Sequence, residues 1–289
     1  MCLRGCHTAN SGGVELGSLV ETDWLAERIS DPSLRLIEVC WDGRADYEEG
    51  HIPGALGWHW KAALWDPFER QFPTENEFSA RLGKAGIGAD TTVVFYGSPI
   101  QFGTYAWWVF KLFGHSDVRI LNGGKVKWRN EGRALSTEEP AVAPASYKPS
   151  LRRPHIRAGR EDVLRAIDDP DCLILDHRSR EEYLGERVGL PGKPDVGAER
   201  YGRIPGAIHI PFDTLLNDDT TFRAVEELKE IIGTNIDGAD HTVISYCRLA
   251  HRATLASFAM TELLGHSNVR VYDGSWTEWG SMVGVPIER

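Results

Sequence analysis

The sequence contains two copies of one pattern, and this internal repeat limits its possible folds more than any other feature. Short segments of the first half recur in the same order in the second half. The matched segments are 36–39 with 174–177, 51–55 with 203–207, 92–96 with 242–246, 112–115 with 263–266, and 122–124 with 273–275. Repetition at this scale indicates one structural unit that is used twice. We therefore predict two domains of the same fold.

Each copy alternates short apolar stretches with longer segments of helical pattern. In the first copy we expect helices at 22–29, 75–83 and 104–113, and strands at 36–39, 92–96 and 118–121. Such alternation is typical of an α/β domain with a mostly parallel central sheet flanked by helices. We assign residues 14–135 to the first domain and residues 156–289 to the second. Residues 136–155 are rich in proline and form the predicted extended linker.

Composition narrows the classes of protein to consider. The chain has 289 residues, enough for two cores, and its formal net charge of -10 argues against general binding to nucleic acid or to an anionic membrane. No apolar run reaches the roughly 18 residues of a membrane span. Residues 1–13 are polar and lack the apolar segment of a signal peptide. We therefore expect a cytoplasmic protein with neither a nucleic-acid nor a membrane partner.

Five cysteines are scattered along the chain, and this odd number does not suggest a disulfide framework. We interpret Cys2 and Cys6 as surface thiols without function rather than as a metal or lipid site. Cys172 is interpreted as a small buried side chain. No metal cluster or dinucleotide fingerprint is visible in the sequence, so we predict neither a metal nor a cofactor. Cys247 is the cysteine whose surroundings indicate chemistry.

Cys247 ends a strand-like run, and a helix is expected soon after it, at 253–264 before Gly265. Parallel α/β sheets place ligands at such junctions. A helix N-terminus and nearby cations lower the pKa of a thiol, so we expect an ionised, nucleophilic cysteine. Arg248, His251 and Arg252 follow within five positions and, with main-chain N–H groups, could bind a small anion. The alternative is that these three residues form a solvated basic turn.

The first copy has no equivalent nucleophile. Residues 97–102 follow the matching strand, and they contain neither a thiol nor a cation. The first copy also holds eight of the ten tryptophans. We interpret most of them as core and interface residues, with a few available to line the site of the second copy. The second copy has its own addition, an insertion at 185–203 that is either functional or simply mobile.

Four motifs point to a known family. They are His-Ile-Pro-Gly-Ala at 51–55, Arg-Ile-Pro-Gly-Ala-Ile at 203–208, Tyr-Cys-Arg at 246–248, and Val-Tyr-Asp-Gly-Ser-Trp-Thr-Glu-Trp-Gly at 271–280. With the tandem architecture, they resemble the two-domain rhodanese family of thiosulfate sulfurtransferases, in register from residue 14 to residue 287. The resemblance implies tandem rhodanese-like domains, of which the first is inactive. It further implies that Cys247 takes the sulfane sulfur of thiosulfate as a persulfide and passes it to cyanide or another thiophilic acceptor.

The resemblance also assigns roles to other residues. Thiosulfate is a dianion, and Arg248 and Arg252 suit its binding and the stabilisation of the sulfite leaving group, with His251 as another donor. Arg178 matches a substrate-binding arginine of the family, although a surface salt bridge is the alternative. Trp41 resembles an aromatic residue that lines the family's substrate pocket, and Phe102 is a second candidate for that wall. The implied partners are a small anionic sulfur donor and a thiophilic acceptor, either a small molecule or a protein.

Three other functions stay open at this point. The 3-mercaptopyruvate branch of the family carries a small, Gly-rich loop after its cysteine, whereas the cationic loop here favours thiosulfate. Dual-specificity phosphatases share the fold but place five residues between Cys and Arg, and Cys247 and Arg252 enclose only four. The shorter loop suits a sulfur atom better than a phosphoryl group. The third function is that of a non-enzymatic sulfur-carrier module.

Overall fold

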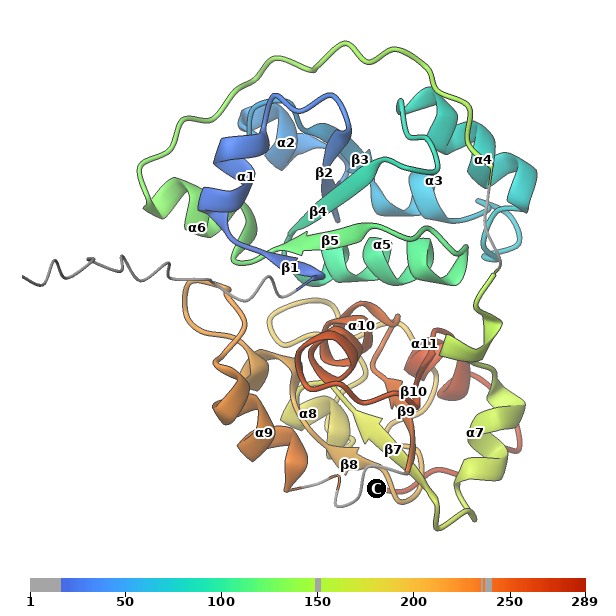
Figure 1. Ribbon diagram of the computed structural model, residues 1–289. Helices are drawn as coiled ribbons and strands as arrows, with labels where there is room; N and C mark the ends of the chain where they lie inside the picture. Colours follow the sequence, from blue (N-terminus) through green and yellow to red (C-terminus); the bar gives the residue numbers. More distant parts are fainter. Residues whose placement is uncertain (1–16, 149–151, 235, 237–240) are drawn as a thin grey trace, which may run out of the picture.

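Two sheets of identical topology organise the molecule (Figure 1). The structure is a computed structural model that describes residues 17–148, 152–234, 236 and 241–289. Cys2 and Cys6 lie outside the described residues. The strand order is β1-β5-β4-β2-β3 in the first sheet and β6-β10-β9-β7-β8 in the second, and every recorded pairing is parallel. The repeat predicted from the sequence is therefore confirmed, as is the α/β fold class.

The strands coincide with the apolar stretches of the sequence. The first sheet contains β1 (Leu19–Val20), β2 (Leu34–Cys40), β3 (Leu56–His59), β4 (Thr92–Ser98) and β5 (Val118–Leu121). The second contains β6 (Arg157–Ala158), β7 (Cys172–Asp176), β8 (Ile208–His209), β9 (Thr242–Tyr246) and β10 (Val269–Tyr272). The central strands β4 and β9 are buried over most of their length, because helices cover both faces of a parallel sheet.

Helices flank each sheet and connect its strands. In the first domain they are α1 (Thr22–Arg28), α2 (Ala45–Glu49), α3 (Trp60–Leu64), α4 (Glu75–Lys84), α5 (Gln101–Leu112) and α6 (Gly124–Asn130). In the second they are α7 (Arg160–Ala166), α8 (Arg180–Tyr183), α9 (Val225–Gly233), α10 (His251–Phe258) and α11 (Ser275–Trp279). The helix expected at 253–264 starts two residues earlier, as α10, and continues as a π-helical turn over Ala259–Leu263.

The segment that joins the domains is extended and runs along the outside of the first domain (Figure 1). Ser136 pairs with His51 through main-chain hydrogen bonds of 2.8 and 2.9 Å. Tyr147 is buried against Phe78 of α4, with ring centroids 6.1 Å apart. Residues 136–147 therefore pack as part of the first domain, because the buried ring supplies apolar area that a free linker would leave in water.

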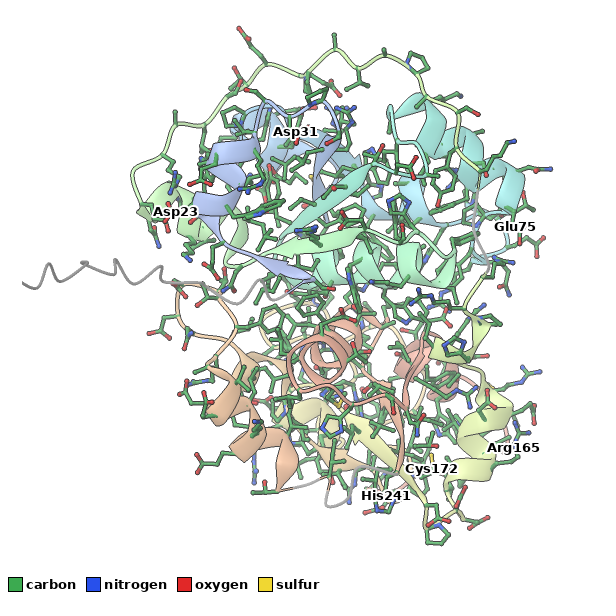
Figure 2. All side chains as sticks on the ribbon, viewed as in Figure 1. Asp23, Asp31, Glu75, Arg165, Cys172 and His241 are labelled. Atoms are coloured by element: carbon green, nitrogen blue, oxygen red, sulfur yellow. The ribbon has the colours of Figure 1, made fainter. Side chains whose placement is uncertain are left out.

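The two domains meet through α5 and α10, which lie against each other between the two sheets (Figure 1). Trp107 packs its ring edge-on against Phe258 at 4.9 Å, and the hydroxyls of Thr104 and Thr254 lie 3.3 Å apart. One cluster of buried apolar side chains runs through both domains, and Figure 2 shows side chains filling the space between these helices. The helix that follows Cys247 is thus covered by the first domain.

None of the described helices is both long and apolar enough to cross a membrane.

Candidate active site

Cys247 is the first residue after β9, at the carboxyl edge of the second sheet. Three residues further on, the chain turns through Ala250, whose φ of 68° lies in the left-handed region, and then enters α10. Ser275 holds this turn, because its Oγ accepts the N–H groups of both Cys247 and Ala250 at 3.2 Å and donates to the Tyr272 carbonyl at 2.8 Å. The main chain around the sulfur is therefore fixed by the first residue of α11.

The next two residues of α11, Trp276 and Thr277, bind carbonyl groups of the same loop. The Trp276 N–H donates to the Cys247 carbonyl at 2.9 Å. The N–H and hydroxyl of Thr277 both donate to the Arg248 carbonyl, at 3.1 and 2.8 Å. The sequence analysis missed Ser275 and Thr277. The signal available for Ser275 was its repeat equivalent, Gly124, which cannot make such contacts because it has no side chain.

The Cys247 side chain is buried, with 1% of the residue exposed, and it belongs to the apolar cluster shared by both domains. A thiolate there is also within reach of a positive group, since its charge contributes to raising the pKa of Arg252. The sulfur lies at the floor of the loop rather than on the surface. Solvent therefore has almost no access to this residue in the structure.

Arg252 is buried and forms a bidentate ion pair with Glu182 of α8, with contacts of 2.7 and 2.9 Å. Burial lowers the pKa of Arg252, but the hydrogen bonds and charge of Glu182 outweigh it, so the net shift is upward. Glu182 in turn accepts the Ser179 N–H at 3.1 Å, which anchors it at the start of α8. The sequence analysis missed Glu182, which lies 70 positions from its partner. The Arg252 charge is thus already balanced, and its predicted role with the donor anion stays a prediction.

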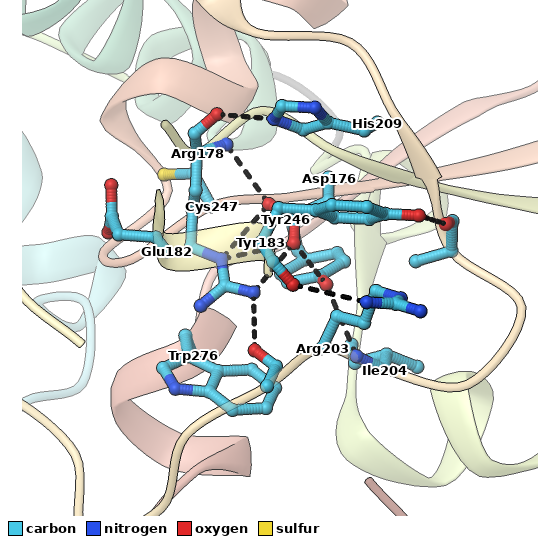
Figure 3. Close-up of polar contacts among 12 residues, drawn as sticks. Asp176, Arg178, Glu182, Tyr183, Arg203, Ile204, His209, Tyr246, Cys247 and Trp276 are labelled. Atoms are coloured by element: carbon cyan, nitrogen blue, oxygen red, sulfur yellow. Dashed lines mark hydrogen bonds and ion pairs between the residues drawn. The ribbon is translucent and has the colours of Figure 1, made fainter. Parts of the chain in front are cut away.

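Arg178 is fully buried, which differs from the surface position that the salt-bridge alternative expected. Its Nη2 donates to Asp176 at 2.7 Å and to the Gly202 carbonyl at 2.8 Å, and the guanidinium stacks 4.4 Å from the Trp276 ring (Figure 3). Burial raises the pKa of Asp176, but the charge and hydrogen bonds of Arg178 reverse this and hold it below its usual value. Arg178 does form a salt bridge, as the alternative expected, but the ion pair lies in the core and not at the surface. The geometry gives Arg178 a structural role, and its binding of substrate stays a prediction.

His251 lies in a box of aromatic rings supplied by the first domain. Its ring centroid is 4.3 Å from Trp60, 4.2 Å from Phe102 and 4.5 Å from Tyr105. Its Nε2 is buried and has no hydrogen-bond partner within the described part of the chain. Burial, followed by the charges of Arg252 and other nearby cations, holds the pKa of His251 well below its usual value. The imidazole is therefore neutral at pH 7 and adds no positive charge.

Trp60 and Phe102 of the first copy pack against His251, in the segment that follows Cys247. Trp41 lies one ring further out, with its centroid 6.5 Å from Phe102, and it is 46% exposed. Its carbonyl accepts the indole N–H of Trp60 at 3.2 Å. Trp107, Trp108 and Trp128 are buried in the cores, as expected for most of the tryptophans. The predicted contact of Trp41 with substrate stays a prediction.

Arg248 is half-buried and points to the insertion at 185–203. Its Nη2 donates to the Val196 carbonyl at 2.7 Å. Of the three cationic candidates beside the cysteine, Arg248 is the one whose recorded partner is an uncharged carbonyl, so its positive charge is not cancelled by that contact. Among the described residues, no group of three histidine, cysteine or acidic side chains is placed to hold a metal ion.

Cys172 starts β7 and so lies at the opposite edge of the sheet from Cys247, far from the domain interface (Figure 2). It is half-buried rather than fully buried, and it packs against the core cluster formed with β10 and α11. Burial, followed by the charge of Asp169, raises the pKa of the Cys172 thiol. This residue is therefore a poor nucleophile and a suitable control for chemistry at Cys247.

Comparison with known proteins agrees with this architecture. The model of the Rhodanese-like domain matches residues 21–131 and 160–282. The chain is 44% identical over 275 residues to "Sulfur carrier protein TtuD" of Thermus thermophilus, covering 94% of this chain and 96% of that one. It is 43% identical over 272 residues to "Putative thiosulfate sulfurtransferase" of Saccharopolyspora erythraea, with the same two coverages.

Solved structures show the same fold. The 3-mercaptopyruvate sulfotransferase SseA from Escherichia coli is 27% identical, with a TM-score of 0.73 over 89% of this chain and 98% of that chain. The anaerobic ergothioneine biosynthesis enzyme from Chlorobium limicola is also 27% identical, with a TM-score of 0.84 over 94% of this chain and 70% of that chain. The repeated sheets, the family match to both halves and the full-length relatives lead to one conclusion. The chain belongs to the two-domain rhodanese family of sulfurtransferases.

Proposed function

We propose that the protein transfers the sulfane sulfur of thiosulfate to cyanide or another thiophilic acceptor through a persulfide on Cys247. The Cys247 thiolate attacks the outer sulfur of thiosulfate, the sulfur–sulfur bond breaks, and sulfite leaves with the bonding electron pair. The acceptor then attacks the outer sulfur of the persulfide. With cyanide this step forms thiocyanate and returns the Cys247 thiolate, so that atoms and charge balance over the cycle.

The observation that carries this proposal is the position of Cys247 in a fixed loop before α10. A helix N-terminus favours the thiolate over the thiol, and main-chain N–H groups of such a loop favour an anion next to it. The equivalent residue of the first copy is Gly97, where a Cβ would lie 2.4 Å from both the Gly103 nitrogen and the Pro99 oxygen. That loop has no room for any side chain, which supports a single nucleophile per chain.

The choice of thiosulfate rests on the positive charge of Arg248, the residue directly after Cys247. Arg248 is a cation whose recorded contact is with a neutral carbonyl, so it can offset the repulsion between a dianion and a thiolate. The relative named as a thiosulfate sulfurtransferase is similar over nearly the whole chain. A second candidate donor is 3-mercaptopyruvate, because SseA, whose printed description names that activity, has the same fold.

A protein acceptor is part of the same proposal. The relative from Thermus thermophilus carries the name of a sulfur carrier, which supports an acceptor larger than cyanide. Both acceptors require the same persulfide on Cys247, so the acceptor does not alter the first half of the reaction.

Mass spectrometry of the intact protein tests the proposal. Incubation with thiosulfate, without an acceptor, should add one sulfur atom to the parent protein and to Cys172→Ser, but none to Cys247→Ser. Addition of cyanide should remove the sulfur and release thiocyanate. A parent protein that stays unmodified by thiosulfate would contradict the proposal, and modification by 3-mercaptopyruvate alone would replace thiosulfate with the second donor.

A further inference from the structure

The insertion at 185–203 is a built part of the second domain. Asp195 ties its first half together by accepting the N–H groups of Val188 and Gly189 at 2.8 and 2.9 Å. Arg200 ties its second half to α11 and the C-terminal segment, donating to the carbonyls of Trp279 at 2.8 Å and Val285 at 3.0 Å. Of the two interpretations made from the sequence, the hydrogen bonds favour a functional segment over a merely mobile one.

The insertion contacts the residue directly after the nucleophile. The Val196 carbonyl accepts from Nη2 of Arg248 at 2.7 Å. Gly197 follows with a φ of +121°, and a Cβ at this position would lie 2.5 Å from Nη2 and 2.7 Å from Nε of Arg248. The guanidinium therefore packs on a peptide surface that only glycine leaves open. The Arg248 Nε is itself buried and has no hydrogen-bond partner within the described ranges.

Both ends of Arg248 are held by parts attached to α11. Its carbonyl accepts from Thr277, while its guanidinium contacts residues 196 and 197, which precede the Arg200 anchor on Trp279. Loop, insertion and helix thus form one hydrogen-bonded unit around this cation. Burial and then the charges of Arg252, Arg70 and Lys61 lower the pKa of His251, and Arg248 adds the smallest of these contributions.

We propose that the peptide of Val196 and Gly197 is a positioning element that fixes the Arg248 guanidinium in the loop directly after Cys247, where its charge selects anionic sulfur donors. This inference rests on the proposed function and adds the residue that determines which charge the sulfur donor must carry. Glu182 neutralises Arg252, and His251 is neutral, so Arg248 is the cation left for the donor among the three candidates from the sequence. Nothing equivalent exists in the first copy, which lacks both the insertion and the arginine.

Gly197→Ala tests the contact, with Gly192→Ala as a matched control. Both glycines lie in the insertion with positive φ, but a Cβ at Gly192 would meet no atom within 4 Å. We measure the second-order rate constant of persulfide formation with thiosulfate. Gly197→Ala should lower it about tenfold, the size expected when one charged hydrogen-bond partner of an anion is displaced. Gly192→Ala should stay within about twofold of the parent, since its new methyl group touches nothing.

A double-mutant cycle separates positioning from general damage to the loop. In an Arg248→Ala background, Gly197→Ala should lower the rate constant by less than about twofold, because the guanidinium that it displaces is already absent. An undiminished tenfold effect in that background would overturn the proposal. So would equal effects of the two glycine substitutions on the rate constant.

A readout without any sulfur transfer keeps this inference separate from the proposed function. Iodoacetate is anionic and iodoacetamide is neutral, and the ratio of their alkylation rates at Cys247 reports on positive charge near the sulfur. Gly197→Ala should lower this ratio several-fold, and Gly192→Ala should leave it unchanged. If thiosulfate fails to modify the parent, the proposed function falls while this ratio still tests Arg248. If the parent accepts sulfur from thiosulfate but Gly197→Ala leaves the alkylation ratio unchanged, only the positioning role is overturned.

Discussion

The two copies bury the same kind of cluster at the same place in the sheet, but they complete it with cations from different positions. In the first copy Tyr96 donates to Glu38 at 2.8 Å, and in the second Tyr246 donates to Asp176 at 2.5 Å. Each tyrosine oxygen also accepts a main-chain N–H from the loop after the second helix of its copy, at 3.1 and 3.2 Å. The clusters therefore tie the same three elements together in both domains.

The positive side chain that pairs with the buried carboxylate comes from a different position in each copy. Lys125 of α6 pairs with Glu38 at 2.7 Å, whereas Arg178, directly after β7, pairs with Asp176. The repeat equivalents of these two positions are Trp276 for Lys125 and Cys40 for Arg178, neither of which is charged. A buried carboxylate requires a partner charge, and either position can supply it. The comparison supports a structural role for Arg178, because a similar ion pair, Lys125 with Glu38, is found in the copy that has no nucleophile.

The largest expected effect comes from removing these carboxylates. Asp176→Asn should lower the free energy of unfolding by about 3–5 kcal/mol, because it leaves a fully buried guanidinium without its counter-ion. Glu38→Gln should cost less, since the Lys125 side chain is 18% exposed and can be rehydrated, while that of Arg178 is 0% exposed. Denaturant titration of both variants measures the difference. A larger loss for Glu38→Gln would break the comparison.

The next effect separates the copies at α2 and α8. Glu182 and Asp46 each lie directly before a tyrosine in the helix after the second strand of their copy. Glu182 holds buried Arg252, whereas Asp46 is exposed and accepts from Ser98 at 2.7 Å. Glu182→Gln should cost about 3 kcal/mol in unfolding free energy, since it removes the charge that balances Arg252. Asp46→Asn should stay within about 0.5 kcal/mol. Similar melting temperatures for the two variants would contradict this assignment.

A smaller effect is expected at the nucleophile position itself. Gly97→Ala should lower the free energy of unfolding by about 1–3 kcal/mol, because its Cβ would overlap main-chain atoms of the loop and α5. Cys247→Ala removes one sulfur from a loop that already holds a side chain and should cost only about 1 kcal/mol. Equal costs for both substitutions would show that the two loops have similar room, against the geometry described above.

The smallest effect concerns pH and the histidine box. Because the pKa of His251 is depressed in the folded protein, the unfolded chain binds more protons as pH falls below the ordinary histidine value. The stability from neutral His251 is therefore complete above about pH 6.5 and declines as pH falls toward the folded pKa. His251→Phe should flatten this part of the stability curve. Denaturant melts between pH 5 and 8, compared with the parent, provide the check, and an unchanged slope would speak against a neutral buried imidazole.

Much of the architecture could be predicted from the chain alone because it depends on local pattern. The apolar stretches became strands, the order of matched segments became two sheets of equal topology, and Cys247 was placed between a strand and a helix. Helix ends were less accurate, as α10 begins at His251 and passes into a π-helical turn that no periodicity indicated. Hydrophobic spacing sets the type of an element, whereas its ends depend on hydrogen bonds from outside it.

The site required more than the sequence offers. Cys247, Arg248, His251 and Arg252 were identified because they are adjacent along the chain. Which of them carries a free charge was decided by distant groups, namely Glu182, the aromatic rings of the first domain and the carbonyl of Val196. The repeat, the fold class and the place of the thiol follow from local composition and spacing, so they could be predicted from the amino acids alone. Which charges are balanced could be seen only in the folded protein, because ion pairing and burial depend on which distant side chains meet.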